Sequence, residues 1–224
     1  MPTLVFWIDV DNTLLANDEV KKVLQHHLQV EMGEQLNTRF WKIYEEVREE
    51  TGLVDIPLSL KRLRAEIPED QLDERTYLHV HSIFDNFPFI KALYPQAIET
   101  LHHLNTIGQT VIVSDGDLDF QAEKIVNSTL AETVEGRVLL YIHKQEHIPD
   151  IQRTYPADHY VMIDDKPQIL IDMKEALGPK ITTVFVRQGK YAKEHPKNFA
   201  PDISVDKIGD LRTFTAEQFL YPNQ

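Results

Sequence analysis

Two kinds of hydrophobic pattern divide the chain. Residues 3–8 are mostly apolar with no polar alternation, which predicts a strand covered on both faces, as in a parallel sheet. Between about residues 16 and 88, apolar residues recur at helical spacing and no strand pattern occurs. From Tyr94 onward, strand and helix patterns alternate. The chain therefore divides into a helical stretch inserted after a first strand and a longer stretch of alternating elements.

The inserted stretch is expected to hold four helical segments. The first begins at Asn17 or Asp18, either of which offers a helix cap. The expected ends are Met32-Gly33, Thr51-Gly52, Pro68 and Pro88. We interpret Trp41 and the other aromatic residues here as the core of a small bundle. The basic residues Lys61, Arg62 and Arg64 are interpreted as a solvated helix face, with contacts to an anionic group such as a phosphate or carboxylate as the less favoured alternative.

The alternating part predicts a doubly wound parallel sheet with right-handed crossovers and helices on both faces. After the first strand, further strands are expected at 110–114, 137–143, 160–164, 182–186 and 203–205. Helices are expected at 95–107, about 118–133, 147–154, 167–177 and near the carboxyl end. The predicted α/β core is residues 1–15 and 89–224, with residues 16–88 as an inserted helical domain.

Composition narrows the classes of function. The 224 residues include no cysteine, which excludes disulfides and thiolate chemistry and fits a reducing compartment, so we expect a cytoplasmic protein. The net charge of −13 argues against nucleic acid and anionic membranes as partners. No apolar run approaches the roughly 20 residues that span a bilayer. The first apolar stretch runs directly into two acids, so we expect no signal peptide.

Polar side chains follow several of the predicted strands at the point where each ends. Asp9 and Asp11 end the first strand, and Ser114 with Asp115 ends the second. Lys144 follows the third strand, and the pair Asp164-Asp165 ends the fourth. Because carboxyl ends of neighbouring parallel strands meet at one crevice, we expect these groups to converge. Carboxylates for a metal, a hydroxyl and an ammonium suit phosphoryl transfer, where positioning and charge neutralisation dominate catalysis.

The acid pair at the first strand end allows two interpretations. Two carboxylates one residue apart repel unless a cation compensates them, which favours a Mg²⁺ site with a carboxylate nucleophile beside an acid/base. A strand ending in a solvated acidic turn explains Asp9 and Asp11 equally well when that stretch is taken alone.

Taken together, the strand ends resemble the four motifs of the haloacid dehalogenase-like (HAD) hydrolase superfamily. The segment 8–14, Ile-Asp-Val-Asp-Asn-Thr-Leu, is similar to the first motif, and Val111 to Ser114 to the second. Lys144 matches the third motif, with Lys166 as the competing lysine, whereas Lys124 is interpreted as part of a solvated helix face. Ile163-Asp164-Asp165 resembles the fourth, and the inserted helices fall where this family places a helical C1-type cap.

The resemblance implies a phosphatase-type mechanism. Asp9 would attack phosphorus and form an aspartyl-phosphate, and Asp11 would act as general acid and then as general base. Mg²⁺ would bind Asp9, the backbone carbonyl of Asp11 and a carboxylate of the Asp164-Asp165 pair, of which we favour Asp165. Ser114 and Lys144 would hold the phosphoryl group. The substrate-binding residues are then expected to be Asp9, Asp11, Ser114, Asp115 and Lys144.

Three functions remain open at this stage. The first is a Mg²⁺-dependent phosphatase acting on a small phosphorylated metabolite, in a monomer or a homodimer. The second is a phosphotransferase or phosphomutase on the same scaffold, and the third is a catalytically silent regulatory protein that keeps the fold and the metal. The resemblance also implies that family members cleaving carbon–halogen bonds lack the second acid and need no metal, so Asp11 favours a phosphatase.

Overall fold

A six-stranded, all-parallel sheet forms the centre of the molecule. In the computed structural model, which describes residues 2–52, 54–116, 118–194, 196–197 and 199–222, the strand order is β3–β2–β1–β4–β5–β6. The strands are β1 (Leu4–Ile8), β2 (Gln109–Asp115), β3 (Val138–Tyr141), β4 (His159–Asp164), β5 (Ile181–Val186) and β6 (Ile203–Val205). The predicted α/β fold with a doubly wound parallel sheet is confirmed.

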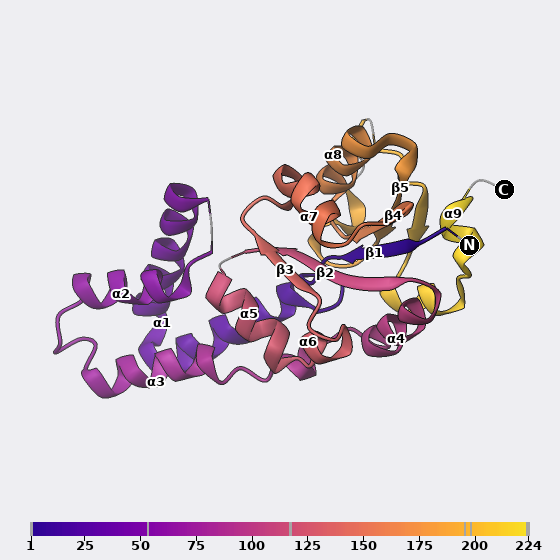
Figure 1. Cartoon of the computed structure of the whole chain (residues 1–224). Helices are drawn as coiled ribbons and strands as arrows, with labels where there is room; N and C mark the ends of the chain where they lie inside the picture. Colours follow the sequence, from indigo (N-terminus) through magenta and orange to yellow (C-terminus); the bar gives the residue numbers. More distant parts are fainter. Residues whose placement is uncertain (1, 53, 117, 195, 198, 223–224) are drawn as a thin grey trace.

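The helices cover both faces of the sheet (Figure 1). They are α1 (Asn17–Thr51), α2 (Ile56–Glu66), α3 (Glu74–Asp85), α4 (Ala97–Ile107), α5 (Leu118–Asn127), α6 (Leu130–Thr133), α7 (Ile148–Thr154), α8 (Pro167–Leu177) and α9 (Ala216–Leu220). Helices α4, α5 and α6 lie on one face, and α7 and α8 lie on the other. Every residue of β1 is buried, which explains why its sequence has no polar alternation.

Helices α1, α2 and α3 lie beside the sheet rather than on either of its faces (Figure 1). Residues 14–16 lead into them and residues 92–94 lead back, and these two connections are hydrogen-bonded to each other. Ala16 N donates to Ala92 O over 2.8 Å, and Tyr94 N donates to Leu14 O over 2.9 Å. The helical stretch is thus joined to the sheet through one pair of adjacent chain segments.

Most predicted elements agree with the structure, except at two breaks in helices. The predicted helix end at Gly33 is a break inside α1, where Gly33 has φ +78°, and the two halves fold back so that Lys21 reaches Glu45. The single helix expected over 118–133 is wrong: α5 and α6 are separated by Ser128 and Thr129, the latter at φ +65°. The structure thus has two shorter helices where periodicity alone predicted one continuous helix.

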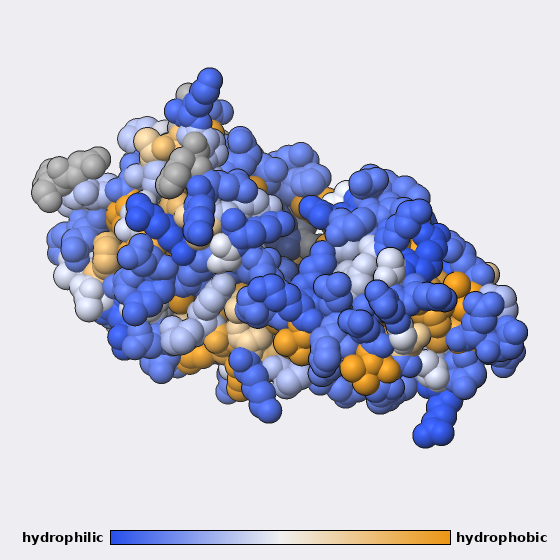
Figure 2. Space-filling view, turned by 180° about the vertical axis from the view of Figure 1, so that it is seen from behind, coloured by the Kyte–Doolittle hydropathy of each residue, from blue (hydrophilic) through white to orange (hydrophobic). Residues whose placement is uncertain are grey.

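The face of the molecule shown in Figure 2 is mainly hydrophilic. On this face, hydrophobic residues form small separate patches between hydrophilic ones. No helix in the described part of the chain is both long enough and apolar enough to cross a bilayer.

Candidate active site

The strand-end residues converge at the carboxyl edge of the sheet, as the sequence predicts. Asp9 follows β1 and its backbone N–H donates to Ile163 O of β4 over 3.0 Å, which places it beside Asp164. Ser114 lies near the end of β2, the next strand on the other side. The residues Asp9, Ser114, Lys144 and Asp164 are all at most 1% exposed. The interpretation of the first acid pair as a solvated turn is therefore wrong for Asp9.

Lys144 is the buried cation of this cluster. Its Nζ lies 2.6 Å from Asp9 Oδ1 and 2.6 Å from Asp164 Oδ2, and it donates to Val113 O over 3.2 Å. Burial disfavours the charged ammonium, but the carboxylates of Asp164 and Asp9 outweigh burial and raise the pKa of Lys144. Lys144 is therefore held charged against two strand-end carboxylates.

The carboxylates outnumber the ammonium that compensates them. One oxygen from each of Asp9, Asp164 and Asp165 lies within 4.8 Å of the other two, and all three residues are buried. Asp9 Oδ2 and both carboxylate oxygens of Asp165 have no hydrogen-bond partner among the described residues. Burial, followed by like charge on neighbouring carboxylates, raises the pKa of both Asp164 and Asp165.

These unpartnered oxygens fit a bound divalent cation. Hard cations such as Mg²⁺ take carboxylate oxygens, and a buried oxygen without a partner carries a large desolvation cost. Asp164 is already engaged by Lys144 and by the backbone N–H of Lys166, which donates to its Oδ1 over 2.8 Å. Of the adjacent acid pair, Asp165 has the two oxygens left for a ligand.

Asp11 is not one of the three clustered carboxylates and pairs with Lys124 instead. Lys124 Nζ donates to its two carboxylate oxygens over 2.7 and 2.9 Å and to Asn17 Oδ1 over 3.1 Å. Lys124 is only 2% exposed, so its interpretation as a solvated side chain is wrong. The mid-helix position suggested solvent exposure, but α5 packs over the loop after β1 and directs Lys124 to Asp11.

Ser114 also has a partner on α5 that was not singled out from the sequence. Gln121 Nε2 donates to Ser114 Oγ over 2.9 Å, and Gln121 is 3% exposed. Gln121 and Lys124 lie three residues apart, on one helical face together with the buried Ile125. Polar residues on the apolar face of a helix are the sequence signal that could have found both.

The backbone around the first acid pair is held from several directions. Asn12 has φ +60°, and its Oδ1 accepts the backbone N–H of Asp18 over 3.1 Å. Gln188 donates to the carbonyls of Asn12 and Thr13 over 3.4 and 3.2 Å. Gly189 packs so close that an added Cβ would lie 2.5 Å from the Asn12 side chain, so a larger residue cannot fit there without displacement.

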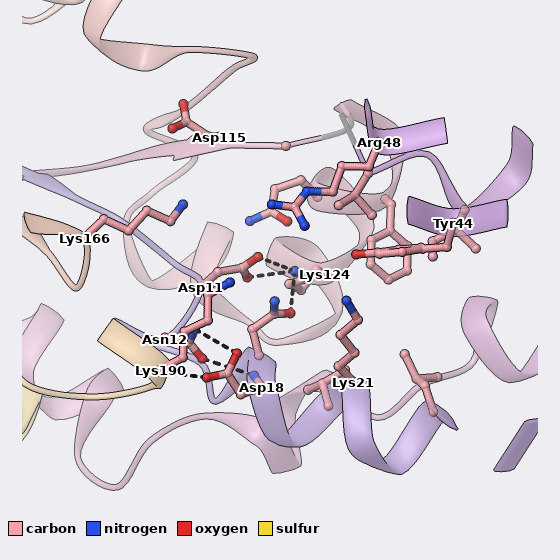
Figure 3. A pocket seen from close by; sticks show the side chains of 18 of the residues that line it. Asp11, Asn12, Asp18, Lys21, Tyr44, Arg48, Asp115, Lys124, Lys166 and Lys190 are labelled. Atoms are coloured by element: carbon pink, nitrogen blue, oxygen red, sulfur yellow. Dashed lines mark hydrogen bonds and ion pairs between the residues drawn. The ribbon is translucent and has the colours of Figure 1, made fainter. Parts of the chain in front are cut away.

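A cavity of about 320 Å³ opens beside these residues, between the sheet edge and α1 (Figure 3). Asp11, Asp115, Gln121, Lys124 and Lys166 are part of its wall on the sheet side. From the helical side it is lined by Lys21, Leu24, Trp41, Tyr44, Arg48, Val54 and Ile56. Trp41 and Tyr44, which periodicity assigned to a bundle core, thus also face a cavity. The basic run in α2 does not line it: Arg62 and Arg64 pair with Glu50 and Glu74.

The two candidate lysines occupy different places. Lys144 contacts Asp9 and Asp164 directly, whereas the side chain of Lys166 points into the cavity (Figure 3). Burial opposes the charge of Lys166, but Asp9 and Asp164 raise its pKa. Asp115 also lines the cavity and accepts the backbone N–H of Lys144 over 2.7 Å, and burial raises its pKa.

The fold and this cluster define an α/β protein with a carboxylate-centred site at the carboxyl edge of a parallel sheet. The chain is 44% identical to a haloacid dehalogenase-like hydrolase from Burkholderia xenovorans, with a TM-score of 0.85 and coverage of 96% of this chain and 97% of that one. The chain therefore belongs to the haloacid dehalogenase-like hydrolases, and the resemblance seen in the sequence is confirmed.

More distant solved structures share the fold. The HAD hydrolase YfnB from Bacillus subtilis, bound to magnesium, is 13% identical with a TM-score of 0.62 and coverage of 94% and 97%. The L-2-haloacid dehalogenase PA0810 is 16% identical with a TM-score of 0.58 and coverage of 95% and 98%. A scan against protein-family models found no match. A search of curated proteins likewise found none.

Proposed function

We propose that this protein is a Mg²⁺-dependent phosphatase that hydrolyses small phosphate monoesters through an aspartyl-phosphate on Asp9. The observation that carries the proposal is the buried cluster in which Lys144 joins Asp9 and Asp164 while Asp165 keeps both oxygens unpartnered. Asp9 and Asp165 would hold the ion, with Asp164 beside them. A bound Mg²⁺ supplies positive charge that offsets the developing charge on the phosphoryl oxygens.

The residues divide the reaction between them. Asp9 attacks phosphorus while the bond from phosphorus to the leaving oxygen breaks, and Asp11 gives that oxygen a proton. Water then attacks phosphorus, Asp11 takes its proton, and the bond from phosphorus to Asp9 breaks. Ser114, with its oxygen occupied by the Gln121 amide, has its own O–H proton available for a phosphoryl oxygen.

Residues 16–88 would act as a cap over this site. The cavity is lined both by strand-end loops and by α1, so a substrate bound there contacts both parts of the chain. The hydrogen-bonded connections at 14–16 and 92–94 are the place where the helical stretch would move relative to the sheet. Enclosure by the cap would keep bulk water away from the reacting phosphoryl group.

The proposal is tested by a screen of phosphate monoesters with Mg²⁺, alongside a 2-haloacid. We expect release of inorganic phosphate and no release of halide, because Asp11 provides a second acid suited to protonating an oxygen leaving group. Halide release without phosphate release would contradict the proposal. Transfer of the phosphoryl group to an added sugar instead of water would favour the phosphotransferase alternative.

Removal of the metal is expected to abolish turnover. Excess EDTA should stop phosphate release, and added Mg²⁺ should restore it. Mg²⁺ should also raise the melting temperature of the wild-type protein, because an ion that binds only the folded state stabilises it. Asp165→Asn should remove most of that thermal shift, and the exposed control Asp70→Asn should keep it. Full activity in chelator, or an equal Mg²⁺ shift in Asp165→Asn, would contradict the metal assignment.

Lys124 is expected to position the general acid. Lys124→Met should lower kcat/KM by about 10- to 100-fold for an alkyl phosphate and much less for p-nitrophenyl phosphate, because a nitrophenolate leaves without a proton. The control is Lys42→Met, which likewise replaces a lysine with methionine but at an exposed position on α1. Equal losses for the two esters would show that Lys124 supports the fold rather than the proton transfer.

A further inference from the structure

The helical side of the cavity carries a cationic wall formed by Lys21, Trp41, Tyr44 and Arg48. Lys21 comes from the first half of α1 and the other three come from the second half. The two halves meet because the helix breaks at Gly33, so residues 27 positions apart in the chain line one cavity. In Figure 3, Lys21, Tyr44 and Arg48 of this wall lie across the cavity from Asp115 and Lys166 on the sheet side.

The positive charge of this wall is only partly compensated. Lys21 Nζ lies 3.2 Å from Glu45 Oε1, and Arg48 Nη1 lies 3.0 Å from Glu45 Oε2, so a single carboxylate serves both cations. Lys21 Nζ also lies 4.4 Å from the centroid of the Tyr44 ring. In a chain with a net charge of −13, a surplus of cations lining a cavity favours an anionic ligand.

The polar groups of the wall are almost all donors. Lysine, arginine and the tryptophan indole can donate hydrogen bonds and cannot accept them. Trp41 Nε1 is buried and has no hydrogen-bond partner in the described part of the chain. The Tyr44 hydroxyl points toward the middle of the cavity, as does the guanidinium of Arg48 (Figure 3). A neutral sugar offers donors and acceptors equally, whereas a carboxylate or phosphate offers only acceptors and matches this wall.

Lys124 and Lys166 on the sheet side of the cavity have other partners, so they do not compete with the cationic wall for an anionic group of the ligand. Lys124 is engaged by Asp11 and Asn17. Lys166 directly follows the Asp164-Asp165 pair, and its backbone N–H donates to Asp164 Oδ1. Lys124 and Lys166 are thus tied to the proposed general acid and to the buried acid pair, and Lys21 and Arg48 on the α1 side are left for another anion. Apolar side chains of Leu24, Val54 and Ile56 complete the helical side.

We propose that the cationic wall binds a second anionic group on the leaving-group part of the substrate. The substrates are then small phosphate monoesters whose alcohol carries a carboxylate or a second phosphate, of a size that fits about 320 Å³. This inference rests on the proposed phosphatase function, since the phosphoryl group must occupy the sheet side. A carboxylate and a phosphate offer the same kind of acceptor oxygen to the donors of the wall, so the experiment distinguishes them.

The test compares three esters with the same carbon skeleton: glycerol 3-phosphate, 3-phosphoglycerate and glycerol 1,3-bisphosphate. At least one of the two esters with an extra anion should have a kcat/KM about 10- to 100-fold above that of glycerol 3-phosphate, the range expected for charge-assisted hydrogen bonds. The preferred ester of the two identifies carboxylate or phosphate. Lys21→Met and Arg48→Met should each reduce this preference about tenfold, and Lys42→Met should leave it unchanged.

A further variant is expected to raise activity, a result that loss of folding cannot produce. Glu45→Gln removes the carboxylate that both cations share, so it should raise kcat/KM for the preferred ester a few-fold and leave glycerol 3-phosphate unaffected. Equal kcat/KM for all three esters, or a preference that survives both Lys21→Met and Arg48→Met, would overturn the cationic-wall proposal and leave the phosphatase proposal standing. No hydrolysis of any phosphate ester would overturn both.

Discussion

Replacing Asp9 with asparagine is expected to lower phosphatase turnover by about 10⁴-fold or more, to the limit of detection. The amide has nearly the shape of the carboxylate but lacks the negative charge needed to attack phosphorus. It also removes one of the oxygens left for a metal ion. Phosphate release by the variant, measured with Mg²⁺ at saturating substrate, checks this expectation.

The fold of the Asp9→Asn variant should remain intact, which separates lost chemistry from lost structure. Asp9 lies in a cluster of three buried carboxylates, of which Lys144 contacts only Asp9 and Asp164, so neutralising Asp9 relieves repulsion while Asp164 still pairs with the ammonium. We expect a melting temperature in chelator at least equal to that of the wild type. The exposed Asp70→Asn serves as the matched control, with normal turnover. Turnover by Asp9→Asn within tenfold of the wild type would show that another residue takes the phosphoryl group.

Replacing Lys144 with methionine is expected to have the largest effect on stability, a loss of about 3–5 kcal/mol in the free energy of unfolding. The variant leaves Asp9 and Asp164 buried without the cation that both contact at 2.6 Å. Removing one partner of a buried ion pair costs more than the pair itself contributes, because the other charge stays desolvated. Denaturant unfolding of the two proteins in chelator measures the difference.

A second substitution tests the cause of that loss. Lys144→Met combined with Asp164→Asn should recover part of the stability, because one uncompensated charge is removed along with the cation. The same methionine replacement at Lys42, which is exposed and lies 3.9 Å from Glu46, should change stability by less than about 0.5 kcal/mol. A loss below 1 kcal/mol for Lys144→Met would contradict the account of a buried compensating cation.

The sheet-side cluster could be predicted from the sequence because its residues lie at strand ends. An apolar run that ends in a polar residue locates that residue at the edge of the sheet, and parallel strands bring such edges together. Asp9, Ser114, Lys144 and the Asp164-Asp165 pair follow this rule, and the structure places them at the same edge. The choice between Asp164 and Asp165 could not be made this way, since it depends on which of them Lys144 engages.

The residues on helices were harder to predict, for a physical reason. Lys124 and Asp11 are 113 positions apart, and their contact depends on how α5 packs over the loop after β1. The cationic wall depends on the chain reversal at Gly33, which brings Lys21 to the second half of α1. Helical periodicity identifies the face of a helix that is buried, but it does not tell whether that face meets a core or a cavity.

The central claim is that Asp9 receives the phosphoryl group, and acid quenching of a single turnover tests it most directly. The protein is mixed with Mg²⁺ and radiolabelled acetyl phosphate, quenched in acid within the first turnover, digested and mapped. The account predicts label on the peptide that contains Asp9, and its loss to inorganic phosphate when the quench is delayed. Label on a different residue, or phosphate release in which the protein never carries label, would contradict it.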